Sequence, residues 1–247
     1  MIRALVLGIY ITLCIVLLLP WLILWTIIVG TPDLMYGLAM KAVRLGNSLV
    51  GIRVRVEGIE NVPSGGCVFI ANHVSNVDPL ALIPEIPRRV AILIKKELMS
   101  IPILAIGMRR AQFVPVDRSD REAAAASVEE AVRFLKQGIS FVIFAEGTRS
   151  ADGRLRPFKR GAFTMAIEAG VPVVPVSLAG TQKLMRKNDW KLHHGEVTVR
   201  FSPAIDAAAY TFERRMELLD RVHAAVSAGL PPDQQPASDS SAAPVDR

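Results

Sequence analysis

The stretch that decides the fold is Cys67-Val68-Phe69-Ile70-Ala71-Asn72-His73-Val74-Ser75-Asn76-Val77-Asp78-Pro79. Its first four residues are apolar and predict a short buried strand, and the turn-forming residues that follow predict a strand end and a helix start. Within this turn, His73 lies five positions before Asp78. An aspartate that accepts a hydrogen bond from one imidazole nitrogen fixes the tautomer and leaves the other nitrogen free to take a proton. The spacing therefore predicts a general base and its orienting partner at the end of a strand.

Two interpretations of this pair are open at the level of the sequence. Asp78-Pro79 is also a favourable helix start, with Asp as the N-cap and Pro at the first helical position, and His73 is then only a polar residue at a strand end. In the catalytic interpretation, no Ser or Cys stands nearby in a recognised nucleophile setting. The base would then have to activate a hydroxyl group of the substrate.

Short apolar runs alternate with helical patterns after the first 50 residues. This alternation predicts an α/β fold with a central, mostly buried sheet flanked by helices. We assign residues 51–228 to this one domain, because that length suits a single domain with a substantial core. The predicted strands are 52–56, 67–72, 90–95, 111–116, 141–145, 173–178 and 197–201, and the predicted helices are 102–110, 122–136, 161–169 and 211–228.

The first 50 residues predict a membrane anchor. Residues 4–32 carry no charge and are long enough, as a helix, to span a bilayer core of about 30 Å. A cleaved signal peptide fits less well, because this apolar region is too long. Pro20 predicts a kink, and it places Trp21 and Trp25 deep in a simple span, although Trp prefers the interface. We therefore favour a kinked helix and an amphipathic helix at 33–50 that lie together in one leaflet, with a single span as the alternative.

Charge and cysteine content narrow the kinds of partner. The 247-residue chain has a net charge of +6, which suggests an anionic membrane surface or a phosphorylated substrate. Nucleic acid is disfavoured, because the chain begins with a membrane segment and shows no recognisable nucleic-acid module. Cys14 and Cys67 lie in apolar runs outside any zinc spacing, so we expect buried thiols in a reducing compartment. Residues 229–247 are rich in Pro, Ser, Ala and Asp and predict a disordered tail.

Three predicted turns place basic groups where a phosphate could bind. They are Val116-Asp117-Arg118, Glu146-Gly147-Thr148-Arg149 and Phe158-Lys159-Arg160-Gly161. In open α/β sheets, ligands bind beyond the carboxyl ends of the strands, and an arginine there can give a phosphate two parallel charge-assisted hydrogen bonds. Any single one of these charges is more commonly a solvated loop residue. Three such turns beside a His–Asp pair favour a phosphate site.

Four short blocks stand in order between residues 52 and 202. They are Asn72-His73-x4-Asp78, FVPVDR at 113–118, FAEGTRS at 144–150 and VPVVPV at 171–176. Together they resemble the glycerolipid acyltransferase family, and most closely its 1-acyl-glycerol-3-phosphate (lysophosphatidic acid) acyltransferases. Lys95-Lys96-Glu97-Leu98 and Phe158-Lys159-x-Gly161 also resemble the family at their expected places. The second block departs slightly, with Ala111-Gln112 where a Gly is frequent.

The resemblance implies transfer of an acyl group from acyl-CoA or acyl carrier protein to the 2-hydroxyl of lysophosphatidic acid. It implies His73 as the general base, Asp78 as its partner, and a Glu146 that orients Arg149 or a glycerol hydroxyl. No metal or other cofactor is needed beyond the acyl-CoA or acyl-ACP co-substrate. The substrate-binding residues that it implies are Lys95, Arg118, Glu146, Gly147, Thr148, Arg149, Lys159 and Pro172.

An enzyme of this kind would act at a membrane. Its lipid substrate and product lie in the bilayer and its thioester donor is cytosolic, which implies a catalytic domain on the cytoplasmic side of the inner or plasma membrane. The alternatives within the family acylate a lyso-ornithine lipid or another lysophospholipid. A non-catalytic lipid-binding protein and a hydrolase are the alternatives outside it, and the intact His73, Asp78, Glu146 and Arg149 disfavour the first of these.

Overall fold

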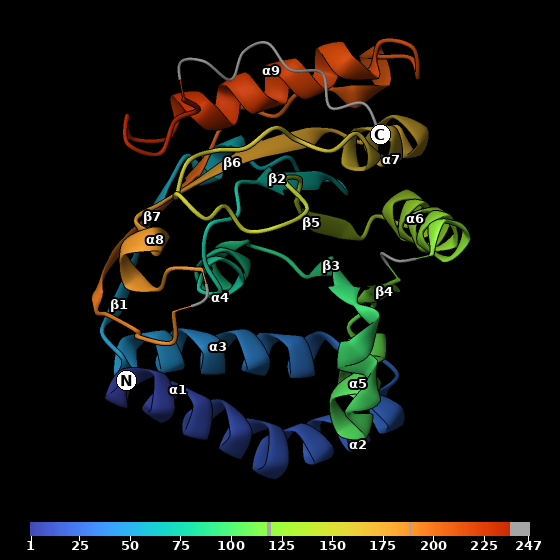
Figure 1. Cartoon of the computed structure of the whole chain (residues 1–247). Coiled ribbons are helices and arrows are strands. Elements are labelled where there is room, and N and C mark those ends of the chain that lie inside the picture. The colour runs from blue at the N-terminus through green and yellow to red at the C-terminus, as the bar shows by residue number, and fades with distance from the viewer. Residues whose placement is uncertain (118–119, 188, 238–247) are drawn as a thin grey trace.

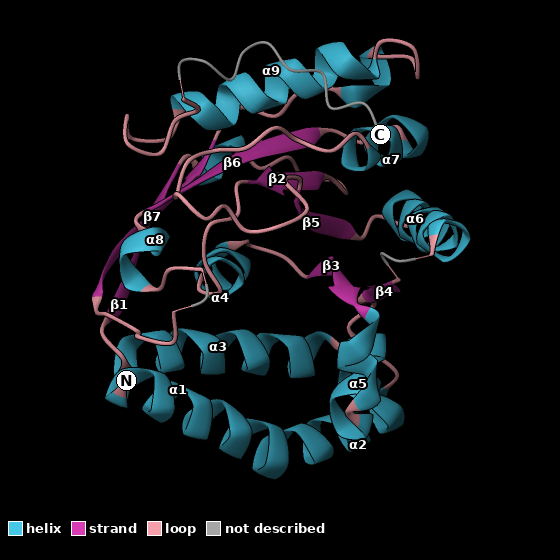
Figure 2. Cartoon of the chain, in the orientation of Figure 1, coloured by secondary structure: helices cyan, strands magenta, loops and turns pink. Residues whose placement is uncertain are grey.

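The computed structural model describes residues 1–117, 120–187 and 189–237 (Figure 1). Arg118, one of the predicted substrate-binding residues, lies outside the described residues. The described chain has a central sheet with helices on both faces, and two long N-terminal helices lie beyond one of those faces (Figure 2). The predicted α/β fold with a buried, helix-flanked sheet is confirmed.

Seven strands within the described residues form one sheet in the order β1-β7-β6-β2-β5-β3-β4. Neighbouring strands are parallel, except that β6 and β7 are antiparallel. All four residues of β2 are buried, which is typical of a central parallel strand covered on both faces. The strands are β1 (Ile52–Glu57), β2 (Val68–Ala71), β3 (Val90–Lys95), β4 (Val114–Val116), β5 (Ser140–Phe144), β6 (Val173–Ala179) and β7 (Gly195–Phe201).

Helices form the outer layers. Figure 1 shows α7 and α9 on one face of the sheet with α6 beside them, whereas α4 and α8 lie toward the N-terminal helices. The helices are α1 (Ile2–Leu13), α2 (Leu19–Val29), α3 (Asp33–Leu49), α4 (Asp78–Leu82), α5 (Pro102–Arg110), α6 (Arg121–Lys136), α7 (Gly161–Ala169), α8 (Thr181–Leu184) and α9 (Arg215–Ala228). Short helical turns are η1 (Cys14–Leu18), η2 (Ile59–Asn61), η3 (Ile83–Glu85), η4 (Lys96–Ser100) and η5 (Ala207–Ala209).

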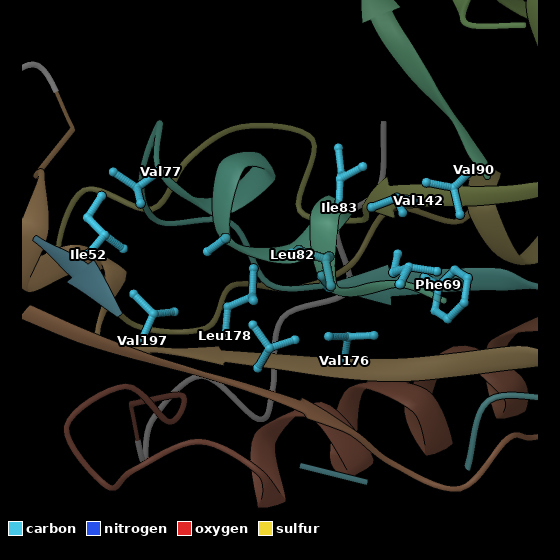
Figure 3. Close-up of a cluster of buried hydrophobic side chains, with 14 of the residues drawn as sticks. Ile52, Phe69, Val77, Leu82, Ile83, Val90, Val142, Val176, Leu178 and Val197 are labelled. Carbon is cyan, nitrogen blue, oxygen red and sulfur yellow. The ribbon is translucent and has the colours of Figure 1, made fainter. Parts of the chain in front are cut away.

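The two faces of the sheet have separate hydrophobic cores, because successive side chains of a strand point to opposite faces. In β2, Phe69 belongs to the core on the side of α4, and Ile70 belongs to the core on the side of α6, α7 and α9. Figure 3 shows the first of these cores, with Phe69, Leu82 and Val176 among its members. The segment that follows β2 is therefore anchored by packing on both faces of the sheet.

The two N-terminal helices are antiparallel. The segments α1, η1 and α2 form one continuous helix, which turns at Gly30 and leads into α3. The Arg3 guanidinium donates to the Val50 carbonyl at 3.0 Å, and the Tyr10 hydroxyl donates to the Ala42 carbonyl at 2.9 Å. The first bond ties the start of α1 to the end of α3, and the second ties Tyr10, farther along α1, to the middle of α3.

The predicted kink at Pro20 corresponds to a π-helical segment, η1, which ends two residues before it. Proline lacks an N–H group and its ring crowds the preceding turn, so the chain accommodates it with a wider turn. The continuous helix Ile2–Val29 is long and apolar enough to cross a membrane. Its surface is open rather than packed, since Trp21 and Ile28 are each 72% exposed. Such a surface is typical of a helix that contacts a membrane.

The chain after α9 differs from the predicted disordered tail at residues 229–237. Leu230 and Gln234 are buried, and the Gln234 carbonyl accepts a hydrogen bond from the Leu155 amide at 2.8 Å. The Gln234 side chain also accepts from the Gly180 amide at 3.1 Å. The Arg154 guanidinium also donates to the Gln235 carbonyl at 3.2 Å, so several hydrogen bonds and a buried leucine hold this segment to the domain, although its average composition is polar. Residues 238–247 lie outside the described residues.

Candidate active site

His73 and Asp78 meet in the connection between β2 and α4. The His73 Nδ1 lies 2.7 Å from Oδ2 of Asp78, which is the first residue of α4 and is fully buried. The same Oδ2 accepts hydrogen bonds from the amides of Val74 and Ser75 at 2.7 and 2.8 Å. A carboxylate only accepts, so Nδ1 carries the hydrogen and Nε2 is left as the basic nitrogen.

Neighbouring groups hold the His73 ring and its loop in place. The imidazole stacks on Phe144, the last residue of β5, with ring centroids 4.3 Å apart. The side chain of Asn72 forms two bonds with the backbone of Leu178 in β6, at 3.0 and 2.8 Å. These contacts fix the loop to the strands on both sides of β2. A preorganised base of this kind loses little entropy when it binds substrate.

The side chain of Glu146 holds the backbone of His73 in place. Its Oε1 accepts from the His73 amide at 2.7 Å, and its side chain is almost fully buried. Oε2 has no hydrogen-bond partner in the described residues. Burial raises the pKa of Glu146 to about 8, with the His73 amide opposing this shift and the charge of Asp78 adding to it. The expected contact of Glu146 with Arg149 is absent among the described residues, and the structure brings Glu146 to His73 instead.

Gly147 allows the turn after β5 to lie against Lys159. Its φ is +72°, and a Cβ at this position would lie 2.7 Å from Cε of Lys159. The Lys159 amide donates to the Ala145 carbonyl at 2.8 Å, which holds the two segments together. A side chain at Gly147 would meet both a strained backbone and an occupied space.

The turn that holds Thr148 and Arg149 is contacted from other loops by two basic residues, Arg156 and Lys187, which sequence reasoning did not single out. The Arg156 guanidinium donates to the Thr148 hydroxyl at 3.0 Å, and the Lys187 ammonium donates to the Arg149 carbonyl at 2.9 Å. The guanidinium of Arg149 has no hydrogen bond or ion pair with any described residue. With Lys159, these side chains form a basic group around the turn after β5, and such a group suits an anionic ligand. This turn lies against the loop of His73, because the Ser150 amide donates to the His73 carbonyl at 2.8 Å. The sequence signal for Arg156 and Lys187 was only that they are basic residues in loops.

Two other predicted residues fall at opposite edges of the sheet. Lys95 ends β3, which is parallel to β5 and β2, so it lies at the carboxyl edge, where His73 and Glu146 also lie. Pro172 precedes β6 and accepts a hydrogen bond from the Val68 amide at the start of β2. The structure therefore places Pro172 at the amino edge and does not bring it together with His73.

An apolar cavity of about 490 Å³ lies mainly between the two N-terminal helices, and α4 and α5 each contribute one residue to its lining. Its lining includes Leu18, Leu22, Ala39, Leu80 and Leu104. Leu80, which lines the cavity, follows Asp78 by two residues in α4, so one short helix carries a residue of the cavity and a residue of the His73–Asp78 pair. Among the described residues, no group of three or more His, Cys, Asp or Glu side chains is arranged to hold a metal ion.

Comparisons with known proteins identify the fold and the family. A family model described as Acyltransferase matches residues 53–179, which contain both the His73–Asp78 pair and the turn after β5. The chain belongs to the acyltransferase family. The crystal structure of the 1-acyl-sn-glycerophosphate (LPA) acyltransferase PlsC from Thermotoga maritima superposes with a TM-score of 0.79 at 29% identity. That match covers 92% of this chain and 93% of the other, so the N-terminal region is included in the likeness.

The sequence relatives of this acyltransferase carry the same name, 1-acyl-sn-glycerol-3-phosphate acyltransferase. A 1-acyl-sn-glycerol-3-phosphate acyltransferase of Limnanthes alba is 32% identical over 189 residues, which cover 76% of this chain and 67% of the relative. The alpha form from Homo sapiens is 34% identical over 177 residues, which cover 70% of this chain and 61% of the relative. A chloroplastic relative from Brassica napus is matched over 42% of its length. The protein is therefore an acyltransferase enzyme, as the four sequence blocks predicted.

Proposed function

We propose that this chain transfers an acyl group from a thioester to the 2-hydroxyl of 1-acyl-sn-glycerol-3-phosphate and so forms phosphatidic acid. The observation that carries the proposal is the juxtaposition of two features at one sheet edge. One is the 2.7 Å contact between His73 and Asp78, and the other is the basic group around Arg149, whose guanidinium is free among the described residues. The first suits activation of a hydroxyl, and the second suits a phosphate on the same acceptor. The names of the relatives support the same acceptor.

The base acts directly on the hydroxyl of the acceptor. Nε2 of His73 removes the proton from the 2-hydroxyl while its oxygen attacks the thioester carbonyl. The tetrahedral intermediate then expels the thiolate, the new ester bond remains, and the imidazolium returns its proton to the leaving sulfur. Asp78 stabilises the imidazolium through Nδ1. No nucleophile of the protein is required in this scheme.

The basic group positions the acceptor. Arg149 supplies a planar fork for two phosphate oxygens, and Lys159 and Lys187 add positive charge nearby. Holding the phosphate fixes the distance from the 2-hydroxyl to Nε2, which converts binding energy into orientation. Lys95 and Arg118 complete this proposed set, Lys95 from the carboxyl end of β3 and Arg118 by its motif. The apolar cavity between the N-terminal helices offers a place for an acyl chain.

The N-terminal helices bring the site to the lipid. We place α1, α2 and α3 in the cytoplasmic leaflet of the inner or plasma membrane, where the lipid acceptor is held in the bilayer and the acyl donor arrives from solution. The exposed side chains of Trp21 and Ile28 support contact with lipid. Acyl-CoA and acyl carrier protein are both compatible donors in this arrangement.

The direct test is an acceptor panel with the purified full chain in mixed micelles. Free thiol released from acyl-CoA is measured with lysophosphatidic acid, lyso-ornithine lipid and lysophosphatidylcholine. We expect a clear preference for lysophosphatidic acid, with phosphatidic acid as the product. Arg149→Gln should raise the KM for lysophosphatidic acid and leave the KM for acyl-CoA nearly unchanged. Equal rates with all three acceptors, or an Arg149→Gln defect confined to acyl-CoA, would refute the proposed acceptor site.

A further inference from the structure

A second, basic cavity lies at the amino edge of the sheet, away from His73. It has a volume of about 230 Å³, and the residues that characterise it are Thr26, Thr31, Arg89, Arg109, Arg110 and Gln112. Arg89 immediately precedes β3, and Arg110 ends α5, a few residues before β4 begins. His73 instead follows the carboxyl end of β2, and β2, β5, β3 and β4 are parallel. The two sites are therefore on opposite edges of the sheet.

The arginines of this cavity have few hydrogen-bond or ion-pair partners among the described residues. The guanidinium groups of Arg109 and Arg110 make no hydrogen bond or ion pair with any described residue. Nη1 of Arg89 is buried without a hydrogen-bond partner, and its nearest carboxylate oxygen, on Asp33, is 3.8 Å away. The Asp33 side chain is 72% exposed, so it screens the three cations poorly. Three like charges around one cavity repel one another, and an anion between them would remove that repulsion.

Gln112 adds a polar group to the same cavity at a conformational cost. It follows α5 and is the single non-glycine residue in the described chain with a positive φ, at +63°. Glycine usually fills this left-handed position after a helix. Oε1 of Gln112 is buried and accepts no hydrogen bond from the described residues. An amide oxygen beside three arginines suits a ligand that carries a hydroxyl group as well as an anionic one.

The surroundings of the cavity are apolar. Ile28 and Val29 of α2 directly precede the lining residue Gly30, and they are 72% and 47% exposed. Leu34 at the start of α3 is 45% exposed, and Ile106, one turn before Arg110 in α5, is 47% exposed. A ligand that satisfies both features has an anionic head and hydrocarbon chains. Free phosphate would satisfy only the arginines.

We propose that this cavity binds the phosphate head group of an anionic phospholipid, separately from the substrate that binds beside His73. The guanidinium groups of Arg109 and Arg110 hold the phosphate oxygens, and Arg89 adds a third donor from the start of β3. A head-group hydroxyl donates to Oε1 of Gln112. The acyl chains then lie along α2 and α5, so that one bound lipid joins the N-terminal helices to the catalytic domain.

The variant that tests this proposal is Arg109→Gln/Arg110→Gln, and the chain offers a matched control. Arg109 and Arg110 lie in the last turn of α5, where they also complement the helix dipole. Arg133 and Lys136 lie in the last turn of α6, are likewise exposed, and line no part of this cavity. Arg133→Gln/Lys136→Gln therefore removes the same charge from the same kind of helix position.

The measurement is native mass spectrometry of the full chain in neutral detergent with phosphatidylglycerol or phosphatidylcholine. We expect the unmodified chain and the α6 control to retain phosphatidylglycerol in preference to phosphatidylcholine. The α5 double variant should retain it at least about tenfold less, because two charge-assisted contacts are lost. Its transferase activity in neutral micelles should stay near normal, which shows that it is folded.

Several outcomes would overturn the proposal. Equal losses in the α5 and α6 variants would mean attraction by net charge alone. Saturable binding of inorganic phosphate without retention of phospholipid would assign the cavity to a soluble anion. An Arg149→Gln variant should keep the bound lipid. If that variant lost it and the α5 variant kept it, the lipid would occupy the active site, and the proposed function would be unaffected.

Discussion

At the residue scale, one oxygen of Asp78 serves two purposes. It accepts from Nδ1 of His73 and from the amides of Val74 and Ser75, so the same atom orders the loop and orients the imidazole. Asp78 is the first helical residue of α4 and Val77 is the N-cap, so the predicted N-cap role of Asp78 is wrong: its side chain bonds the loop before the helix instead of capping it. A buried carboxylate with three donors is costly to remove, since its partners would be left unsatisfied.

Glu146 should make the stability of the protein depend on pH. Its pKa is raised to about 8 in the folded chain, above the ordinary value of an unfolded glutamate. The folded state therefore holds this proton more tightly, and its contribution is fully present below about pH 4.5 and is lost as the pH rises toward 8. Glu146→Gln keeps an acceptor for the His73 amide and cannot ionise. We expect the unmodified chain to lose stability relative to Glu146→Gln across that window, by at most about 1.4 kcal/mol per pH unit.

The measurement is the denaturant midpoint of both proteins at a series of pH values from 5 to about 9. The difference between the two denaturant midpoints should change steadily with pH and then level off above the pKa of Glu146. Two curves that stay parallel throughout would show that Glu146 is ionised, or is equally stable in both forms, in the folded chain.

Sequence spacing was enough to pair His73 with Asp78, because five residues in a turn leave few ways to separate them. It was not enough for Glu146, whose partner is a backbone amide 73 residues away. The basic residues Arg156 and Lys187 were missed for the same reason, since only the fold brings their loops to the turn after β5. Pro172 was assigned from its block alone, and the direction of β6 places it at the other edge.

At the element scale, the turn after β5 depends on Gly147. Gly147→Ala would force a Cβ to within 2.7 Å of Lys159 at a φ of +72°. We expect a loss of about 1–3 kcal/mol in the free energy of unfolding and a reduced affinity for lysophosphatidic acid, because Arg149 belongs to the same turn. Gly65→Ala is the control, since nothing lies within 4 Å of its added Cβ. Equal stability and equal KM for the two variants would show that the turn tolerates a side chain.

The apolar cavity between the N-terminal helices gives a second prediction at this scale. Ala39 of α3 lines this cavity, and Leu in its place would reduce the space available to a long acyl chain. We expect Ala39→Leu to lower turnover with long acyl chains more than with short ones. Ala126→Leu on the exposed side of α6 makes the same chemical change away from the cavity. An unchanged ratio of long-chain to short-chain rates would mean that neither acyl chain enters this cavity.

The elements themselves were mostly predictable. Apolar runs of strand length identified each strand of the sheet, although β4 is shorter than the predicted 111–116, because Ala111 and Gln112 complete the end of α5. Pro20 predicted that the helix would be distorted near this position, but it did not predict that the distortion would be a π-helical turn. The antiparallel pairing of β6 with β7 was not predictable, since strand direction depends on long-range connections.

At the scale of the whole molecule, the predicted anchor and the catalytic domain meet through α3. The hydrogen bond from Arg3 to the Val50 carbonyl places the N-terminus beside the end of α3, just before β1 begins. If the pair lies in one leaflet, the N-terminus and the domain share a side of the membrane. Single cysteines at Ile2 and at the exposed Ala209, after replacement of Cys14 and Cys67, test this arrangement.

Both probes should resist an impermeant thiol reagent in intact cells and react after the membrane is opened. Labelling of the Ile2 probe alone from outside would establish a single span. Labelling of both probes from outside would place the domain on the other side of the membrane from the one proposed. The sequence alone could not choose between a span and a hairpin, because a long apolar helix satisfies either.

The measurement that tests the central claim most directly is the turnover of His73→Ala with acyl-CoA and lysophosphatidic acid, followed by thiol release. General-base assistance contributes roughly 10²–10⁴-fold, so we expect a loss of at least that order in kcat. The variant should keep an unfolding temperature close to that of the unmodified chain, because the His73 side chain lies at the edge of the core with 20% of its surface exposed. A folded His73→Ala protein with near-normal turnover would contradict the account.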